Sequence, residues 1–227
     1  MEKSKIIEKL FEHIVIYSYL ILPVLFLIFR QKKRDSVILA VYGLVFFLLL
    51  FFYEDLKKID KKTYHAVYTF LEYSFFTVLY YLNLENKKFK QLITILSGCF
   101  IIFLIIFNLF TGKARVDSIP IGVESILVFV YIFLFFLQVL NKPQGGFVYL
   151  NHCFWISVGL LVYLGGSFFI NIYGSSLSKE EFDKFWYLNY IADTFKTILF
   201  AVGFLFLARR PDPVNQKSAS VPYLDMI

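Results

Sequence analysis

The sequence has little charge and little cysteine. Of its 227 residues, 18% are charged, whereas 59% are hydrophobic and 21% are aromatic. Soluble domains carry about 25% charged and about 45–50% apolar residues. The charges collect in short clusters between long apolar runs, and an apolar run of about 18 or more residues is typical of a membrane-spanning helix. This pattern excludes an ordinary soluble domain.

Cysteine and histidine give no indication of a metal site or of catalysis. Cys99 and Cys153 are too few for a disulfide framework, and we expect both to be small buried thiols in apolar runs. His13 and His65 fall near one membrane face and His152 near the other, too far apart for one zinc ion with ligands about 2 Å away. No nucleophile motif or phosphate-binding loop is present. The sequence therefore predicts no metal, no catalytic residue and no enzyme.

Seven apolar runs are long enough to cross a bilayer, for which a helix needs about 20 residues. The sequence predicts an all-α, polytopic bundle of seven transmembrane helices within residues 1–208, followed by a flexible tail at 209–227. The helices are expected at about 10–29, 36–53, 64–84, 91–110, 119–140, 147–173 and 185–208. The first run is too long for a cleaved signal sequence, so we expect it to be retained as a span. Pro23 predicts a kink in it, and Pro120 predicts the start of the fifth helix.

The orientation in the membrane rests on where Lys and Arg fall in the loops. They divide evenly between the two sides, so the count alone does not decide. The RQKKR cluster at 30–34 is dense and adjoins the first helix, whereas the basic residues on the N-terminal side are diluted by acidic ones. We therefore predict a multi-pass protein of a plasma membrane or bacterial inner membrane, with its N-terminus outside and its C-terminus inside.

Ionisable residues within the spans mark the candidate site. Each costs about 2.5–3.5 kcal/mol on insertion, and such residues face the bundle interior. Glu72 and Asp193 lie at similar depths in the third and seventh runs, and Lys196 lies near the middle of the seventh. Because odd-numbered helices begin on the N-terminal side, these groups gather in that half of the membrane. The sequence predicts a ligand-binding or ion-pair pocket there, formed by Glu72, Asp193, Lys196, Asn189, Glu124, Tyr68 and Asn171.

Lys196 has two main interpretations. It can pair with Asp193 or Glu72 and so hold the third and seventh helices together, which is the preferred interpretation. A lysine in a seventh helix is also similar to the retinal-linking lysine of rhodopsins, which makes retinal on Lys196 an alternative cofactor. The aspartate lies three residues before the lysine rather than the four of microbial rhodopsins, and their third-helix pattern is absent. These differences disfavour retinal, and no other cofactor is predicted.

Two segments carry a resemblance to other proteins. FLEY at 70–73 and DTFKTILFAVGF at 193–204 resemble a loose group of small seven-helix membrane proteins from Bacteroidota-type genomes. The resemblance covers most of the chain in layout. It implies the seven-helix fold and implies no activity.

The function predicted from these features is that of a non-enzymatic sensor or accessory module. It would bind a ligand, a lipid or a partner in the polar pocket, because no effector domain adjoins the spans. The alternative is a small-solute or proton-coupled transporter that uses the same residues. Membrane lipid is an expected partner, and a protein partner would contact the tail or the 30–35 loop. The basic residues are interleaved with the spans, so nucleic acid is not expected.

Overall fold

The computed structural model describes the backbone of residues 2–53, 55–56, 61–110, 118–141, 148–173 and 179–209. It describes the side chains of residues 9–53, 55–56, 63–110, 119–141, 148–167 and 188–209. Within these ranges all regular secondary structure is helical. The elements are α1 (Glu2–Ser18), α2 (Ile21–Phe29), α3 (Arg34–Phe51), α5 (Lys61–Asn83), α6 (Lys87–Phe110), α7 (Ser118–Leu140), η1 (Val148–Leu150), α8 (His152–Tyr173) and α9 (Lys179–Arg209).

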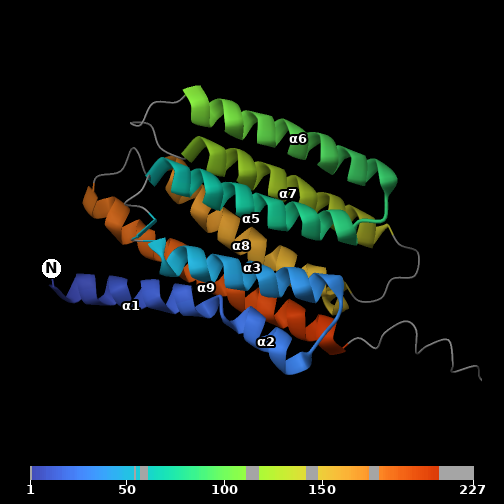
Figure 1. Ribbon diagram of the computed structural model, residues 1–227, viewed down its shortest axis with the longest axis horizontal. Coiled ribbons are helices and arrows are strands. Elements are labelled where there is room, and N and C mark those ends of the chain that lie inside the picture. Colours follow the sequence, from blue (N-terminus) through green and yellow to red (C-terminus); the bar gives the residue numbers. More distant parts are fainter. Residues whose placement is uncertain are drawn as a thin grey trace, which may run out of the picture.

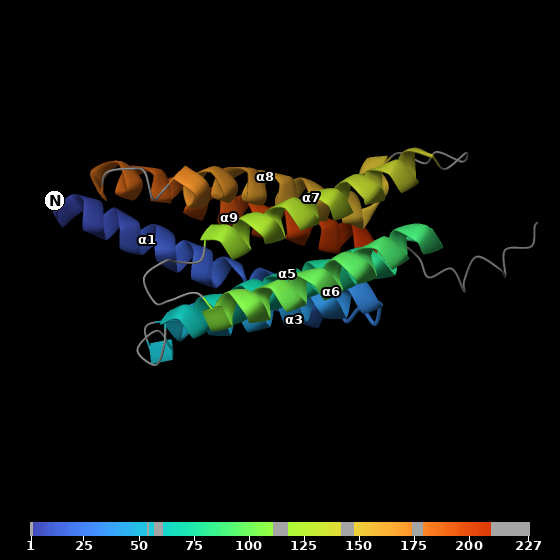
Figure 2. The same ribbon diagram turned by 90° about the horizontal axis from the view of Figure 1, so that it is seen from above.

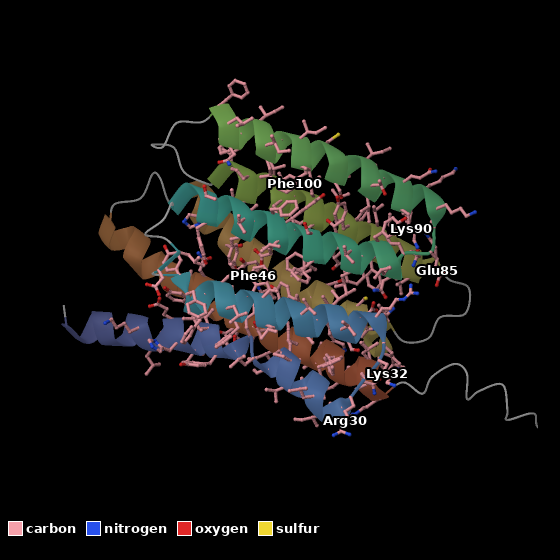
Figure 3. The ribbon with its side chains drawn as sticks, viewed as in Figure 1. Arg30, Lys32, Phe46, Glu85, Lys90 and Phe100 are labelled. Atoms are coloured by element: carbon pink, nitrogen blue, oxygen red, sulfur yellow. The ribbon has the colours of Figure 1, made fainter. Side chains whose placement is uncertain are left out.

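The long helices lie side by side in an elongated bundle (Figure 1). Turned by 90°, the bundle has α8 and α9 on one side and α3, α5 and α6 on the other (Figure 2). Helix α9 packs along α8 and also contacts α1, α2 and α3, while α7 contacts α5, α6 and α8. Arg30, Lys32, Glu85 and Lys90 all lie at the end of the bundle opposite the start of α1 (Figure 3). The two described loops at 31–33 and 84–86 therefore lie at the same end of the bundle, as the sequence predicts.

Five segments of the described chain have the length and hydropathy of membrane spans. They are Lys9–Phe29, Arg34–Phe51, Lys87–Phe110, Ile119–Leu140 and Leu188–Arg209. Helix α5 is long enough, but its polar side chains lower its mean hydropathy. The described apolar part of α8, His152–Ser167, is shorter than a span. The all-helical fold class is confirmed for the described residues, and the seven-span arrangement stays a prediction.

The outer surface of the bundle is apolar. Leu109 is 74% exposed, Phe110 is 83% exposed and Leu140 is 72% exposed, and many other aliphatic side chains on the helices are exposed as well. A soluble monomer rarely presents apolar patches beyond a few hundred Å², because water disfavours them. Lipid tails are as apolar as these side chains, so the surface fits a bilayer.

The first span differs from the single helix expected at 10–29. It starts earlier, at Glu2, and is broken after Ser18 into α1 and α2. Pro23 has no N–H, so the carbonyl of Tyr19 lacks its helical donor four residues on. Gly43 of α3 makes room for the break, since a Cβ there would lie 2.6 Å from the Tyr19 carbonyl oxygen and 2.9 Å from Pro23 Cδ. The helix break thus lies four residues before Pro23, and it directs the Tyr19 side chain toward the core.

Candidate functional site

Lys196 of α9 lies at the centre of a buried charged cluster, which we call the Lys196 cluster (Lys196, Asp193, Glu72 and Tyr19). Its Nζ lies 2.6 Å from Asp193 Oδ1, one turn earlier on α9, and 3.2 Å from Glu72 Oε1 on α5. The exposed fraction is 0% for Lys196, 4% for Glu72 and 8% for Asp193. Because Lys196 has no exposed surface, no water-sized space touches its side chain. The ammonium is therefore compensated by protein groups alone.

Tyr19 completes the cluster from the break between α1 and α2. Its hydroxyl donates to Asp193, with oxygen–oxygen distances of 2.8 and 3.1 Å, and accepts a hydrogen bond of 3.0 Å from Lys196 Nζ. A buried hydroxyl that both donates and accepts stabilises the ion pair without leaving a polar atom unpaired. Sequence patterns alone missed Tyr19, because a tyrosine in an apolar run gives no sign of where it points.

Aromatic rings enclose the ammonium of Lys196. Its Nζ lies 3.7 Å from the ring centroid of Tyr163 on α8, 5.4 Å from that of Tyr19 and 5.8 Å from that of Tyr42. Cations within about 6 Å of an aromatic face are attracted by its quadrupole. The Tyr163 hydroxyl also donates to Glu72 Oε2 at 3.4 Å. Lys196 Nζ is thus contacted from four helices and from the helix break: α3, α5, α8 and α9, and Tyr19 between α1 and α2.

Close packing of α8 on α9 places Tyr163 over the cluster. A Cβ on Gly159 of α8 would lie 3.2 Å from the carbonyl oxygen of Lys196, and one on Gly166 would lie 3.2 Å from Ala192 Cβ. Small residues spaced in this way let two helices approach closely. The glycines therefore set the distance at which the Tyr163 ring meets the ammonium.

With Glu124 of α7, the site has three acidic side chains and one basic side chain. It is 3% exposed, its Oε1 has no hydrogen-bond partner among the described residues, and the charges of Glu72 and Lys196 act on it. Were Glu72, Asp193 and Glu124 all ionised, Lys196 would neutralise only one of them. An uncompensated buried carboxylate is costly, so this end of the site has capacity for a cation or a proton.

The other predicted site residues are placed less centrally. Tyr68 is half-buried, packs edge-on against Phe46 and interacts electrostatically with the cluster. Asn189 lies one turn before Asp193, and its Oδ1 is buried without a partner in the described chain. Asn171 lies in α8, but its side chain falls outside the described residues.

A small pocket lies at the N-terminal end of the bundle, toward which the predicted site was expected to open. It is enclosed by α5, α6 and α7, and its lining residues are His65, Ala66, Thr69, Leu104, Phe107, Asn108 and Pro120. Thr69 lies one turn before Glu72 on α5 and is 3% exposed. Through Thr69, the pocket lies one helical turn from Glu72, on the side where α5 begins.

The described residues leave no space for a retinal at Lys196. A retinal attached to Lys196 requires a long cavity beside the ammonium, and the rings of Tyr19, Tyr42 and Tyr163 fill that position. The side chain of Lys196 has no exposed surface from which such a cavity could begin.

These features define a class: a helical protein with apolar, span-length helices around a buried charged centre. No family model matches the chain, and no curated protein or solved structure is significantly similar to it. The resemblance to small seven-helix membrane proteins therefore stays a prediction.

Proposed function

We propose that this chain is a seven-span membrane protein that acts as a non-enzymatic sensor or accessory module, with the Lys196 cluster at its centre. In addition to the five span-length segments, α5 and α8 supply the two remaining spans. The acidic side chain of α5, Glu72, is paired with Lys196, which reduces the penalty of placing it in a bilayer. Contacts with α3, α6 and α7 surround α5, so its less apolar surface faces protein.

The observation that carries the proposal is the surplus carboxylate beside a closed ion pair. Oε1 of Glu124 is buried and has no partner in the part of the chain that the structure describes, while Asp193 and Glu72 both contact the ammonium of Lys196. A ligand with a cationic group would supply the missing positive charge. A metabolite amine, a lipid head-group amine and a partner's basic side chain share this chemistry. Such a ligand would enter from the N-terminal side, next to the pocket at Thr69.

Binding of this ligand would then change how the helices of the bundle pack. The cluster joins the helix break at Tyr19, α5 and α9, so a second cation would compete with Lys196 for Glu72. A ligand shifts a conformational equilibrium only by its differential affinity for the two states. Release of Glu72 from Lys196 would provide that difference.

Native mass spectrometry of the gently purified full chain tests this proposal. We expect a cationic small molecule or lipid bound in stoichiometric amount to the unsubstituted protein. It should be lost from Glu124→Gln and Glu72→Gln and retained by the matched control Glu85→Gln, whose side chain is exposed at the opposite end. A ligand that remains bound after both Glu124→Gln and Glu72→Gln, or a protein free of any bound molecule after supply of membrane extract, would contradict the proposal.

A proton-coupled transporter is the second candidate. The observation that favours it is the break at Tyr19 directly beside the cluster, because transporters place discontinuous helices at substrate and ion sites near the bilayer midplane. Uptake by proteoliposomes under a pH gradient separates the two functions. Accumulation of a solute that is abolished by Glu72→Gln, but not by Glu85→Gln, would replace the sensor proposal with transport.

The 30–35 loop is the proposed contact for a partner on the C-terminal side, which we place inside the cell. Gln31 Nε2 and Lys33 Nζ donate to the carbonyl oxygens of Ala208 and Leu207 at 3.3 and 3.0 Å and so cap the end of α9. Arg30, Lys32 and Arg34 are exposed beside this cap. These cations fit an acidic partner surface or anionic lipid. The expected tail contact lies at 210–227, outside the described residues.

A further inference from the structure

A second polar cluster lies at the opposite end of the bundle, where α3 and α8 begin. Asp35 in the first turn of α3 meets His152 and Cys153 in the first turn of α8. His152 Nε2 lies 2.7 Å from Asp35 Oδ2 and 3.4 Å from Cys153 Sγ. One ligand atom from each of the three residues falls within 4.8 Å of the other two.

We infer that Asp35, His152 and Cys153 form a binding site for a divalent transition-metal ion of the zinc class. A tetrahedral ion with bonds of about 2.0–2.3 Å holds its ligand atoms about 3.3–3.6 Å apart. The nitrogen–sulfur distance already lies in this range. The nitrogen–oxygen distance would open by about 0.6 Å from its hydrogen-bonded value, and the oxygen–sulfur distance, at most 4.8 Å, would settle at about 3.5 Å.

The charge of the three ligands suits such an ion. A carboxylate, a thiolate and a neutral imidazole carry two negative charges, which a divalent ion neutralises. A neutral assembly is favourable here because the site is shielded: the side chains of His152 and Asp35 are 9% and 15% exposed, and Cys153 is 1% exposed. A thiolate and an imidazole together select zinc-class ions over Mg²⁺ or Ca²⁺, which prefer oxygen ligands.

The surroundings allow the required proton shifts. When Nε2 binds the metal, the ring proton moves to Nδ1, which is buried and has no hydrogen-bond partner among the described residues; this N–H then requires an acceptor such as a bound water. The thiol proton of Cys153 passes to solvent. Asn83 Nδ2 donates to Asp35 Oδ2 at 3.0 Å, which holds the carboxylate toward the site. Outer hydrogen bonds of this kind orient metal ligands.

The cluster differs from a catalytic cysteine–histidine–aspartate triad. In a triad the acid binds one ring nitrogen and the nucleophile faces the other. Here Asp35 Oδ2 and Cys153 Sγ both face Nε2 of His152. Because both ligand atoms face the same nitrogen, a metal ion can take the place of the proton on Nε2 and bind all three atoms.

Cobalt binding to the reduced, chelator-treated full chain in detergent tests the inference. Co²⁺ stands in for zinc and gives a thiolate-to-metal absorption band only when sulfur is bound. We expect one equivalent to bind with this band, and Zn²⁺ to displace it. The band should disappear in Cys153→Ser, and affinity should fall at least about tenfold in Asp35→Asn. Two matched controls, Cys99→Ser on the exposed face of α6 and His13→Gln on α1, should bind as the unsubstituted chain does.

The unsubstituted chain decides the outcome even if a variant fails to fold. The absence of a thiolate–cobalt band at excess Co²⁺ would overturn the inference and leave a hydrogen-bonded Asp35–His152 pair. A band that persists in Cys153→Ser and vanishes in Cys99→Ser would overturn it as well. The site is independent of the Lys196 cluster, so neither result bears on the proposed function.

Discussion

Lys196 Nζ and Glu72 Oε1 lie 3.2 Å apart, although 124 positions separate the two residues in the sequence. The contact ties α9 to α5, which lie on opposite sides of the bundle (Figure 2). A cation and a carboxylate buried together are stable only as a pair, because either one alone would be an uncompensated charge. The bundle therefore closes around this contact.

Removal of the ammonium should destabilise the protein strongly. In Lys196→Met, Glu72 and Asp193 remain buried without their cation, which we expect to lower the free energy of unfolding by about 3–5 kcal/mol. Thermal or denaturant unfolding in detergent measures this loss. The control Lys90→Met removes an ammonium that lies over the Tyr81 ring at 5.1 Å; that change should cost no more than about 0.5–1 kcal/mol. Equal losses in the two variants would contradict the assigned role of Lys196.

A double-mutant cycle measures the contact itself. Glu72→Gln keeps the size of the side chain and removes its charge, so the combination with Lys196→Met leaves less uncompensated charge than Lys196→Met alone. We expect the double variant to be more stable than the sum of the single effects predicts, by about 1–3 kcal/mol. Additive effects within about 0.5 kcal/mol would show that the pair is not coupled.

Tyr19→Phe tests the helix break as part of the cluster. The hydroxyl donates to Asp193 and accepts from Lys196, and hydrogen bonds to charged groups contribute about 1.5–3 kcal/mol. We expect a loss of stability in that range. Tyr17→Phe, two residues earlier on α1, is the matched control because Tyr17 is 52% exposed, and its unfolding midpoint should stay unchanged. Similar behaviour of the two variants would place the Tyr19 hydroxyl outside the cluster.

The glycine opposite the break should tolerate no side chain. In Gly43→Ala the new Cβ would meet the Tyr19 carbonyl oxygen at 2.6 Å, and such overpacking costs about 1–3 kcal/mol. Gly98→Ala in α6 meets no atom within 4 Å and should be neutral or stabilising by up to about 1 kcal/mol. Unfolding of both variants in the same detergent provides the comparison. A neutral Gly43→Ala would mean that the break does not pack against α3 in this way.

Apolar runs were sufficient to predict the helices but not how they pack. The long uncharged stretches place the helices between 34 and 140 to within about four residues, whereas α8 begins at His152 rather than 147 and α9 at Lys179 rather than 185. The first span differs most. There Pro23 indicated a kink, yet the break lies at Tyr19 and Leu20, because a proline frees the carbonyl four residues before it. Its position also depends on Gly43, a contact between two helices that no local pattern encodes.

The charged residues of the candidate site were predictable, because a charge within an apolar run is conspicuous in the sequence. Glu72, Asp193 and Lys196 stand out because a buried charge needs a partner, and the structure brings them together. Tyr19 and Tyr163 do not stand out, since tyrosines are frequent in this sequence. Asp35 was expected in the loop before the second helix, but it lies within α3 and pairs with His152. This contact depends on the packing of two helix ends that are far apart in the sequence.

The central claim of the proposed function is that the Lys196–Glu72 contact keeps the site closed toward the N-terminal side until a ligand competes for Glu72. The reactivity of Thr69→Cys, in a chain with Cys99 and Cys153 replaced by serine, toward a membrane-impermeant thiol reagent tests it in sealed vesicles. We predict slow labelling that rises about tenfold when Glu72→Gln is added, which corresponds to about 1.4 kcal/mol of closing free energy. The increase should occur only with reagent on the N-terminal side. An unchanged rate, or an increase with reagent on the other side, would contradict the account.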